Sequence, residues 1–194
     1  MKKNISIISD DLYFINGASS VLHDFSVIGI HIGSEVNLYQ EKSGFFENIF
    51  VDINSILIIS IKCISLMLKI VNHFSNTMIP ILVFFNEKNE NRFFTKIKNI
   101  TILSKHIDEE SFKQALYIAS SSFKIKELQL SHRQVYIMRW LMKGGSLESA
   151  SATAGISLKT ASAHKISFLK EIDVRCIQQA FNVIMFILSF LCEL

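Results

Sequence analysis

The first two-thirds of the chain alternates short, continuously apolar runs with longer mixed segments. Short apolar runs are typical of buried strands, and the segments between them are typical of helices. The expected strands are residues 5–9, 27–32, 48–53, 79–85 and 100–103, and the expected helices are residues 12–22, 56–74, 87–99 (a short one) and 109–120. Strands that alternate with helices predict a parallel sheet with helices on both faces.

The last third of the chain has the spacing of several short helices. Ser131, followed three places later by Gln134, predicts a capping box at the start of the first of them. A helix of small residues is expected over residues 146–154, and Gly155 would supply the turn after it, because glycine adopts positive φ at low cost. Ser157 is expected to cap the next helix. A helix, a glycine turn and a second helix form the layout of a helix-turn-helix, whose second helix lies in the major groove of DNA.

One side of that second helix carries side chains suited to DNA. By 3.6-residue periodicity, one face holds Lys159, Ser162, Ala163, Ile166 and Lys170. The residues pointing mostly the other way, which are expected in the core, are Ala161, Phe168, Leu169 and Ile172. Lysine can hold phosphates, serine can bond base edges, and alanine or isoleucine can meet a thymine methyl. On spacing alone, the solvated face of an ordinary amphipathic helix fits equally well.

The charge is unevenly distributed. Residues 1–123 hold 11 Lys/Arg and 12 Asp/Glu, whereas residues 124–175 hold 9 Lys/Arg and only 4 Asp/Glu. A near-neutral part joined to a basic part favours a polyanionic partner for the second, although charge alone is equally explained by a solvated basic surface. Hydrophobic residues make up 49% of the chain, which provides ample material for a core and excludes a disordered chain.

The cysteines and the apolar stretches bear on where the protein works. Cys63, Cys176 and Cys192 are scattered without metal-binding spacing, which predicts reduced thiols in a cytoplasmic protein. Residues 56–71 and 176–192 are strongly apolar, but the first is interrupted by lysines and both fall short of the ~20 residues that a spanning helix needs. We therefore do not expect a membrane partner.

A specific residue pattern runs through residues 130–174. Its elements are Leu130-Ser131, Arg133, Gly144, Ile156-Ser157, Lys159-Thr160 and His164, with Ile172 and Val174 closing it. This pattern closely resembles the LuxR/FixJ-type DNA-binding domain. The resemblance implies a structural role for His164 and DNA-facing positions at Lys159, Thr160, Ser162, Ala163, Lys165, Ile166 and Lys170. It also implies that residues 177–194 form the family's last helix, commonly a dimer contact; because this helix is apolar nearly all round, we expect it to be buried in a dimer or against the first domain.

Polar residues follow the expected strands of the first part: Asp10, Asp11, Asp52, Asn86 and Lys105. The carboxyl ends of parallel strands meet at one edge, and carboxylates there could hold a divalent cation. The arrangement resembles the receiver domain of bacterial response regulators. The resemblance implies Asp52 as phosphoacceptor, Mg²⁺ at Asp10, Asp11 and Asp52, and a pocket completed by Asn86 and Lys105. The family has Ser or Thr where Asn86 stands, and a Pro and Gly after the acceptor that are missing here. In this incompleteness the chain is similar to the auxiliary RcsA/BglJ-like regulators, which work with a partner response regulator.

Together these observations predict a flavodoxin-like α/β receiver-like domain over residues 1–122, a linker over 123–129, and an all-α four-helix domain over 130–194 ending in a dimerisation helix. The expected function is that of a sequence-specific transcriptional regulator that works without phosphorylation, without enzymatic activity and without a required cofactor. Activator is the expected sense of regulation, and the sequence leaves activator or repressor open. Expected partners are double-stranded DNA, a second copy or a response-regulator-type partner, and RNA polymerase. The alternatives are a phosphorylation-switched regulator using Asp52, and more remotely a metal-dependent phosphohydrolase using Asp10 and Asp52.

Overall fold

The centre of the first domain is a sheet of mainly parallel strands. The computed structural model describes residues 4–32, 55–87, 93–120 and 127–193, and within them the strand order is β2-β1-β3-β4-β6-β5. The parallel strands are β1 (Asn4–Ser9), β2 (Ser26–His31), β3 (Ile56–Ser60), β4 (Ile81–Phe85) and β6 (Ile100–Ser104). At one edge, β5 (Phe93–Ile97) runs antiparallel to β6. The order of the parallel strands is that of the flavodoxin-like doubly wound fold, which confirms the predicted fold class.

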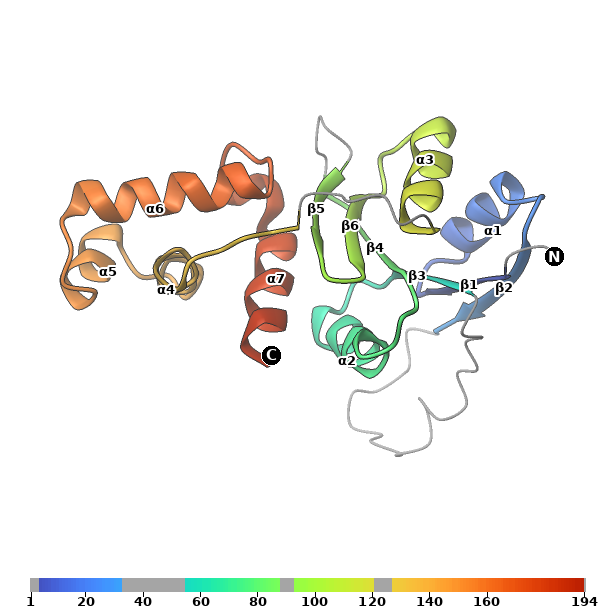
Figure 1. Ribbon diagram of the computed structural model, residues 1–194, viewed down its shortest axis with the longest axis horizontal. Coiled ribbons are helices and arrows are strands. Elements are labelled where there is room, and N and C mark those ends of the chain that lie inside the picture. Colours follow the sequence, from blue (N-terminus) through green and yellow to red (C-terminus); the bar gives the residue numbers. More distant parts are fainter. Residues whose placement is uncertain (1–3, 33–54, 88–92, 121–126, 194) are drawn as a thin grey trace.

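Helices cover both faces of this sheet (Figure 1). Helices α1 (Leu12–Val21) and α3 (Glu109–Ser120) cover one face, and α2 (Ile64–Ser75) lies on the other. Adjacent residues of a strand point to opposite faces. Thus the Phe84 ring packs between Phe14 of α1 and Phe112 of α3, with centroid distances of 5.3 and 5.7 Å, whereas Phe85 belongs to the core on the α2 side. The alternation explains why β4 is apolar throughout.

Two of the helices predicted in the first domain differ from the structure, the first of them only in part. Residues 56–74 form the fully buried strand β3 and then α2, which begins only at Ile64. Periodicity cannot separate the strand from the helix, because both are continuously apolar. The pairing of β3 with β1 and β4 is what separates them. Residues 87–99 contain β5 rather than a short helix, and the chain turns into β6 through Lys98, whose φ is 51°. The predicted strand 48–53 lies outside the described residues.

The second domain follows the predicted plan closely. Its helices are α4 (His132–Met142), α5 (Leu147–Thr153) and α6 (Leu158–Glu171), followed by the short 3-10 turn η1 (Ile177–Ala180) and α7 (Phe181–Glu193). The capping box is present, because the Ser131 hydroxyl accepts from the Gln134 backbone N–H while the Gln134 side chain accepts from the Ser131 N–H. Local side-chain chemistry therefore sets these helix boundaries.

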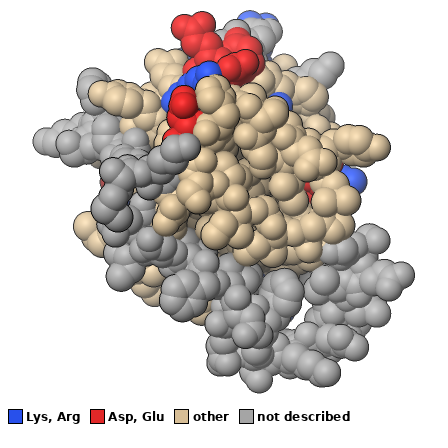
Figure 2. Space-filling model, turned by 90° about the vertical axis from the view of Figure 1, so that its right-hand side faces the viewer, with Lys and Arg blue, Asp and Glu red and all other residues tan. Residues whose placement is uncertain are grey.

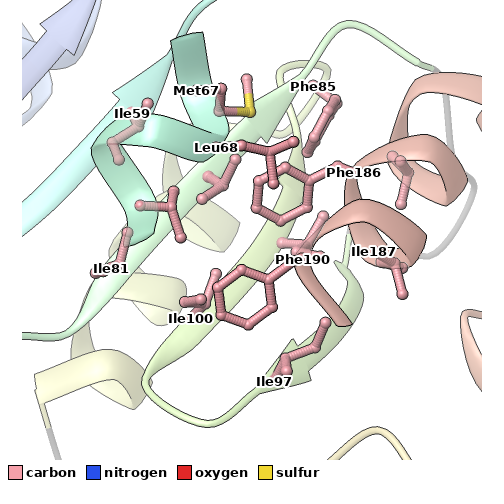
Figure 3. Packing of buried hydrophobic residues seen from close by; sticks show 14 of the residues in the cluster. Ile59, Met67, Leu68, Ile81, Phe85, Ile97, Ile100, Phe186, Ile187 and Phe190 are labelled. Atoms are coloured by element: carbon pink, nitrogen blue, oxygen red, sulfur yellow. The ribbon is translucent and has the colours of Figure 1, made fainter. Parts of the chain in front are cut away.

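Helix α7 joins the two domains into one core. It lies between the helices α4–α6 and the sheet (Figure 1), on the sheet face that α2 covers only in part. Figure 3 shows Phe186 and Phe190 of α7 directed at side chains of α2, β4, β5 and β6. The Phe186 ring lies 5.5 Å from that of Phe85 and 6.1 Å from that of Phe190, and all three side chains are buried. In the described residues, the connection from β4 to β6 contains the strand β5 and not a helix that could cover the sheet. Helix α7 covers that part of the sheet instead.

The position of α7 bears on the predicted dimer contact. Its apolar residues Val183, Ile184, Phe186, Ile187 and Phe190 are all 0% exposed within the single chain. Of the two predicted destinations, burial against the first domain is therefore the one that the structure has, and these side chains are not available to a second copy in this conformation. Most of the predicted linker lies outside the described residues. No helix in the described ranges is both long and apolar enough to cross a membrane.

Candidate nucleic-acid interface

Helix α6 is packed on one side and free on the other. Ala161, Phe168, Leu169 and Ile172 are buried, as predicted, against α4, α5 and α7. The opposite side carries five of the residues predicted to face DNA: Lys159, Ala163, Ile166 and Lys170 are exposed, and Ser162 is half-buried. Of the other two, Thr160 is exposed in the first turn beside this face, and Lys165, four residues from both Ala161 and Leu169, is half-buried on the packed side. His164, predicted to be structural, is also half-buried. The fold thus brings Lys159, Ser162, Ala163, Ile166 and Lys170 together on one free helix face, and Lys165 lies apart from them.

The orientation of α6 is fixed by specific contacts at its start and middle. The Ser157 hydroxyl accepts the Thr160 backbone N–H at 3.1 Å and lies 2.8 Å from the Thr160 hydroxyl, so Thr160 is held by the cap. Gln134 of α4 donates its side-chain amide to the Ser167 hydroxyl at 2.9 Å. Gly155, with φ of 64°, makes the turn from α5, where an L side chain would be strained. The free face is therefore held in a defined direction.

Two residues beside this face were not singled out from the sequence. Leu158, the first residue of α6, is 46% exposed, and Glu148 stands in the first turn of α5. Both line an open hollow with Lys159, Ser162, Ala163 and Ile166, which we call the α5–α6 hollow. The Glu148 backbone N–H and the Ser146 hydroxyl hold the pKa of the Glu148 carboxyl below its ordinary value, so it is ionised at neutral pH. The 3.6-residue periodicity of α6 cannot point to Glu148, because Glu148 comes from the preceding helix.

The lysines of α6 carry positive charge that no carboxylate of the described residues neutralises. Lys159, Lys165 and Lys170 form no ion pair within the described ranges. Figure 2 shows the opposite end of the molecule, where most of the charged side chains in view gather at one edge and only a few isolated ones interrupt the uncharged surface elsewhere. Phosphate groups attract lysines that no carboxylate neutralises. The side of the molecule suited to a polyanion is therefore the α6 side.

The predicted receiver pocket is only partly assembled. Asp11 Oδ1 caps α1 by accepting the backbone N–H groups of Tyr13 and Phe14 at 3.0 and 3.2 Å. Lys105, directly after β6, places its Nζ 3.7 Å from Asp11 Oδ2, so these two predicted residues are brought together. Asp10 Oδ2 accepts the Lys62 backbone N–H at 2.9 Å. The Asp11 carboxylate therefore caps α1 and contacts Lys105, and the Asp10 carboxylate binds the backbone that follows β3.

Beyond this pair, the strand ends carry a further acid among the described residues: Glu87 follows Asn86 after β4, and its Oε1 accepts the Asn182 backbone N–H at 3.0 Å. Asn86 follows β4 and is exposed, and its carbonyl oxygen lies 3.0 Å from His106 Nε2. The carboxyl end of β3 holds Ser60, whose buried hydroxyl lacks a hydrogen-bond partner in the described part of the chain. The predicted acceptor Asp52 lies outside the described residues, and the strand expected to end at it is not the β3 observed between β1 and β4. Sequence reading missed Ser60 because residues 56–60 were assigned to a helix.

The described residues do not fit a Mg²⁺ site. Nowhere in the described ranges do three or more His, Cys, Asp or Glu side chains cluster in a way that could hold a metal ion. Of the two described pocket acids, only Asp10 Oδ1 is without a hydrogen-bond partner, and it is a single oxygen where Mg²⁺ prefers a full octahedral shell. We therefore derive no step through Mg²⁺ for this chain.

Comparisons with known proteins give one family match and several fold matches. Residues 128–184 match the family described as GerE, bacterial regulatory proteins of the luxR family. A solved structure of the two-component response regulator RcsB in complex with DNA is 16% identical, with a TM-score of 0.53 over 98% of this chain and 99% of that one. A structure of two RcsB dimers bound to two parallel DNAs is also 16% identical, with a TM-score of 0.52 over the same shares. These similarities show a shared fold along the whole chain. The comparison with curated proteins gives no match.

Proposed function

Residues 128–184 form a helix-turn-helix domain of the luxR family, and we propose that through it the chain binds double-stranded DNA as a regulator of transcription. The single observation that carries the proposal is the free face of α6, which gathers Lys159, Ser162, Ala163, Ile166 and Lys170. In a helix-turn-helix, the exposed face of the second helix enters the major groove, and the flanking cations set its register on the phosphates.

A lysine double variant tests this proposal. In Lys159→Ala/Lys165→Ala, each lost phosphate contact should lower the slope of log affinity against log salt by about 0.9, so the slope should fall by about 2. Binding of the full-length protein to a DNA fragment is measured by fluorescence anisotropy over a range of salt concentrations. The matched control is Lys113→Ala in α3, which removes an exposed lysine far along the chain from α6 and should leave the slope unchanged. Equal slopes for the double variant and wild type would remove α6 as the DNA-contacting helix.

We further propose that regulation by this chain does not depend on phosphoryl transfer. The support is the state of the receiver edge, where β3 ends on Ser60 and where Asp11 is engaged by α1 and Lys105. The full-length protein, incubated with a small phosphodonor and Mg²⁺, should give no phosphorylated band in a Phos-tag gel. A band in the wild type that disappears in Asp52→Ala would contradict this and favour a phosphorylation-switched regulator.

Pairing on DNA is the last part of the proposal. The similar RcsB structures are described as a DNA complex and as dimers on DNA, and helix-turn-helix proteins commonly bind two half-sites as dimers. We expect this chain to bind as a homodimer or beside a response-regulator-type partner. Because the apolar side of α7 is buried, the contact would use another surface. Sedimentation velocity on the protein alone and with a two-site duplex measures the stoichiometry; a single protomer per duplex at saturation would exclude the homodimer.

A further inference from the structure

The α5–α6 hollow has an apolar floor in the middle of a basic face. Leu158 and Ile166 are 46% and 48% exposed, and Ala163 between them is exposed as well. Leu158 and Ile166 are large apolar side chains left open on a helix whose opposite side is already buried in the core. The residues around them are Leu147 and three that can hydrogen bond a base edge, Glu148, Lys159 and Ser162.

The charges around the hollow decide what can enter it. Lys159 stands at one end, and Lys165 and Lys170 follow on α6, so phosphates are attracted to the borders of the face. The Glu148 carboxylate repels a phosphate and the N7 and O6 acceptors of guanine, and it can accept a hydrogen bond from the amino group of cytosine or adenine. The floor formed by Leu158, Ala163 and Ile166 has no hydrogen-bonding side chain, so the group that suits it is an apolar base edge. In the major groove, the C5-methyl of thymine is the group of that kind.

We propose that the α5–α6 hollow selects thymine by receiving its C5-methyl group against Ile166, Ala163 and Leu158. This inference rests on the proposed DNA binding and adds to it a specificity that comes from a methyl contact, beside any hydrogen bonds that Ser162 or Lys159 makes to bases. The lysines supply affinity for any sequence, and the hollow distinguishes thymine from cytosine, adenine and guanine at the positions beneath α6.

Deoxyuridine tests the methyl contact directly, because it differs from thymidine only in lacking that group. Bound duplexes are first selected from a random-sequence library with the full-length protein. Each thymine of a selected duplex is then replaced by uracil, and the Kd is measured for each substitution. Burial of one methyl group gives ~0.8 kcal/mol, so wild type should lose about four-fold in affinity at one or two thymines per half-site.

Variants of Ile166 assign the contact to the hollow. Ile166→Ala should lose the difference between thymine and uracil at a sensitive position, whereas Ile166→Val, which keeps a branched apolar side chain, should retain most of it. Circular dichroism checks that both variants are folded, as expected for a side chain that is 48% exposed.

The outcomes separate this inference from the proposed function. DNA binding that depends on Lys159 and Lys165 but is indifferent to uracil at every thymine overturns the inference and leaves the proposed function standing. Uracil sensitivity that persists unchanged in both Ile166→Ala and Leu158→Ala overturns the assignment to the hollow. Failure to select or bind any DNA overturns both.

Discussion

Replacing Phe186 by alanine should destabilise both domains at once, because its ring lies in the core that they share. The side chain is 0% exposed, contacts Phe85 of the sheet and stacks on Phe190 of its own helix at an interplanar angle of 7°. Truncation of a fully buried phenylalanine costs roughly 3–5 kcal/mol, which includes the cavity that remains. Against a typical total stability of about 5–15 kcal/mol, this is a large fraction.

The matched control lies five residues earlier in the same chain segment. Phe181 begins α7 and is 47% exposed, so Phe181→Ala removes the same side chain from a site with little packing. Surface substitutions of this kind usually change stability by less than about 0.5 kcal/mol, and partial burial raises that to an expected loss of about 1 kcal/mol. The contrast between the two variants isolates the effect of the shared core from that of losing an aromatic residue.

The assay must report on each domain separately. Trp140 is the only tryptophan and stands in α4, so its fluorescence follows the second domain during urea unfolding. Hydrogen exchange of the peptides covering β4 and β6 follows the first domain. In wild type the two reports should give one transition, and in Phe186→Ala both should move to lower urea. If the fluorescence midpoint falls while the strands keep their full protection, the two domains do not share a core and the reasoning is wrong.

Three further substitutions have defined outcomes. Asp11→Ala should cost about 1–2 kcal/mol in urea unfolding, because α1 loses its cap as well as the Lys105 contact, whereas Asp11→Asn keeps a capping oxygen and should cost less. Gly155→Ala should cost about 1–2 kcal/mol, since φ is 64° there, and the loss should appear as a lower Tm; an unchanged Tm would show that the turn relaxes. A hydrogen bond with the Ser65 hydroxyl, at 3.2 Å, lowers the pKa of the Cys63 thiol, so more thiolate is present at neutral pH than without the bond. Ser65→Ala should therefore move the pH profile of Cys63 alkylation to higher pH, and an identical profile would refute the role of that bond.

The second domain could be predicted closely because its structure follows from short-range chemistry. The Ser131 and Gln134 capping box, the Gly155 turn and the Ser157 cap each act over a few residues, and the structure confirms all three. The core and free sides of α6 follow from periodicity once the helix ends are known. What periodicity on α6 could not reveal was Glu148, since its place beside the free face depends on how α5 packs.

In the first domain, the sequence by itself determined the alternation of strands and helices and hence the fold class. It did not determine which apolar run becomes the central strand, because residues 56–60 read equally well as the start of a helix until pairing with β1 and β4 decides. That choice places Ser60 at the edge where an acid was expected. Tertiary structure alone also decided that an apolar helix at the end of the chain covers the sheet, because burial depends on contacts between segments some hundred residues apart.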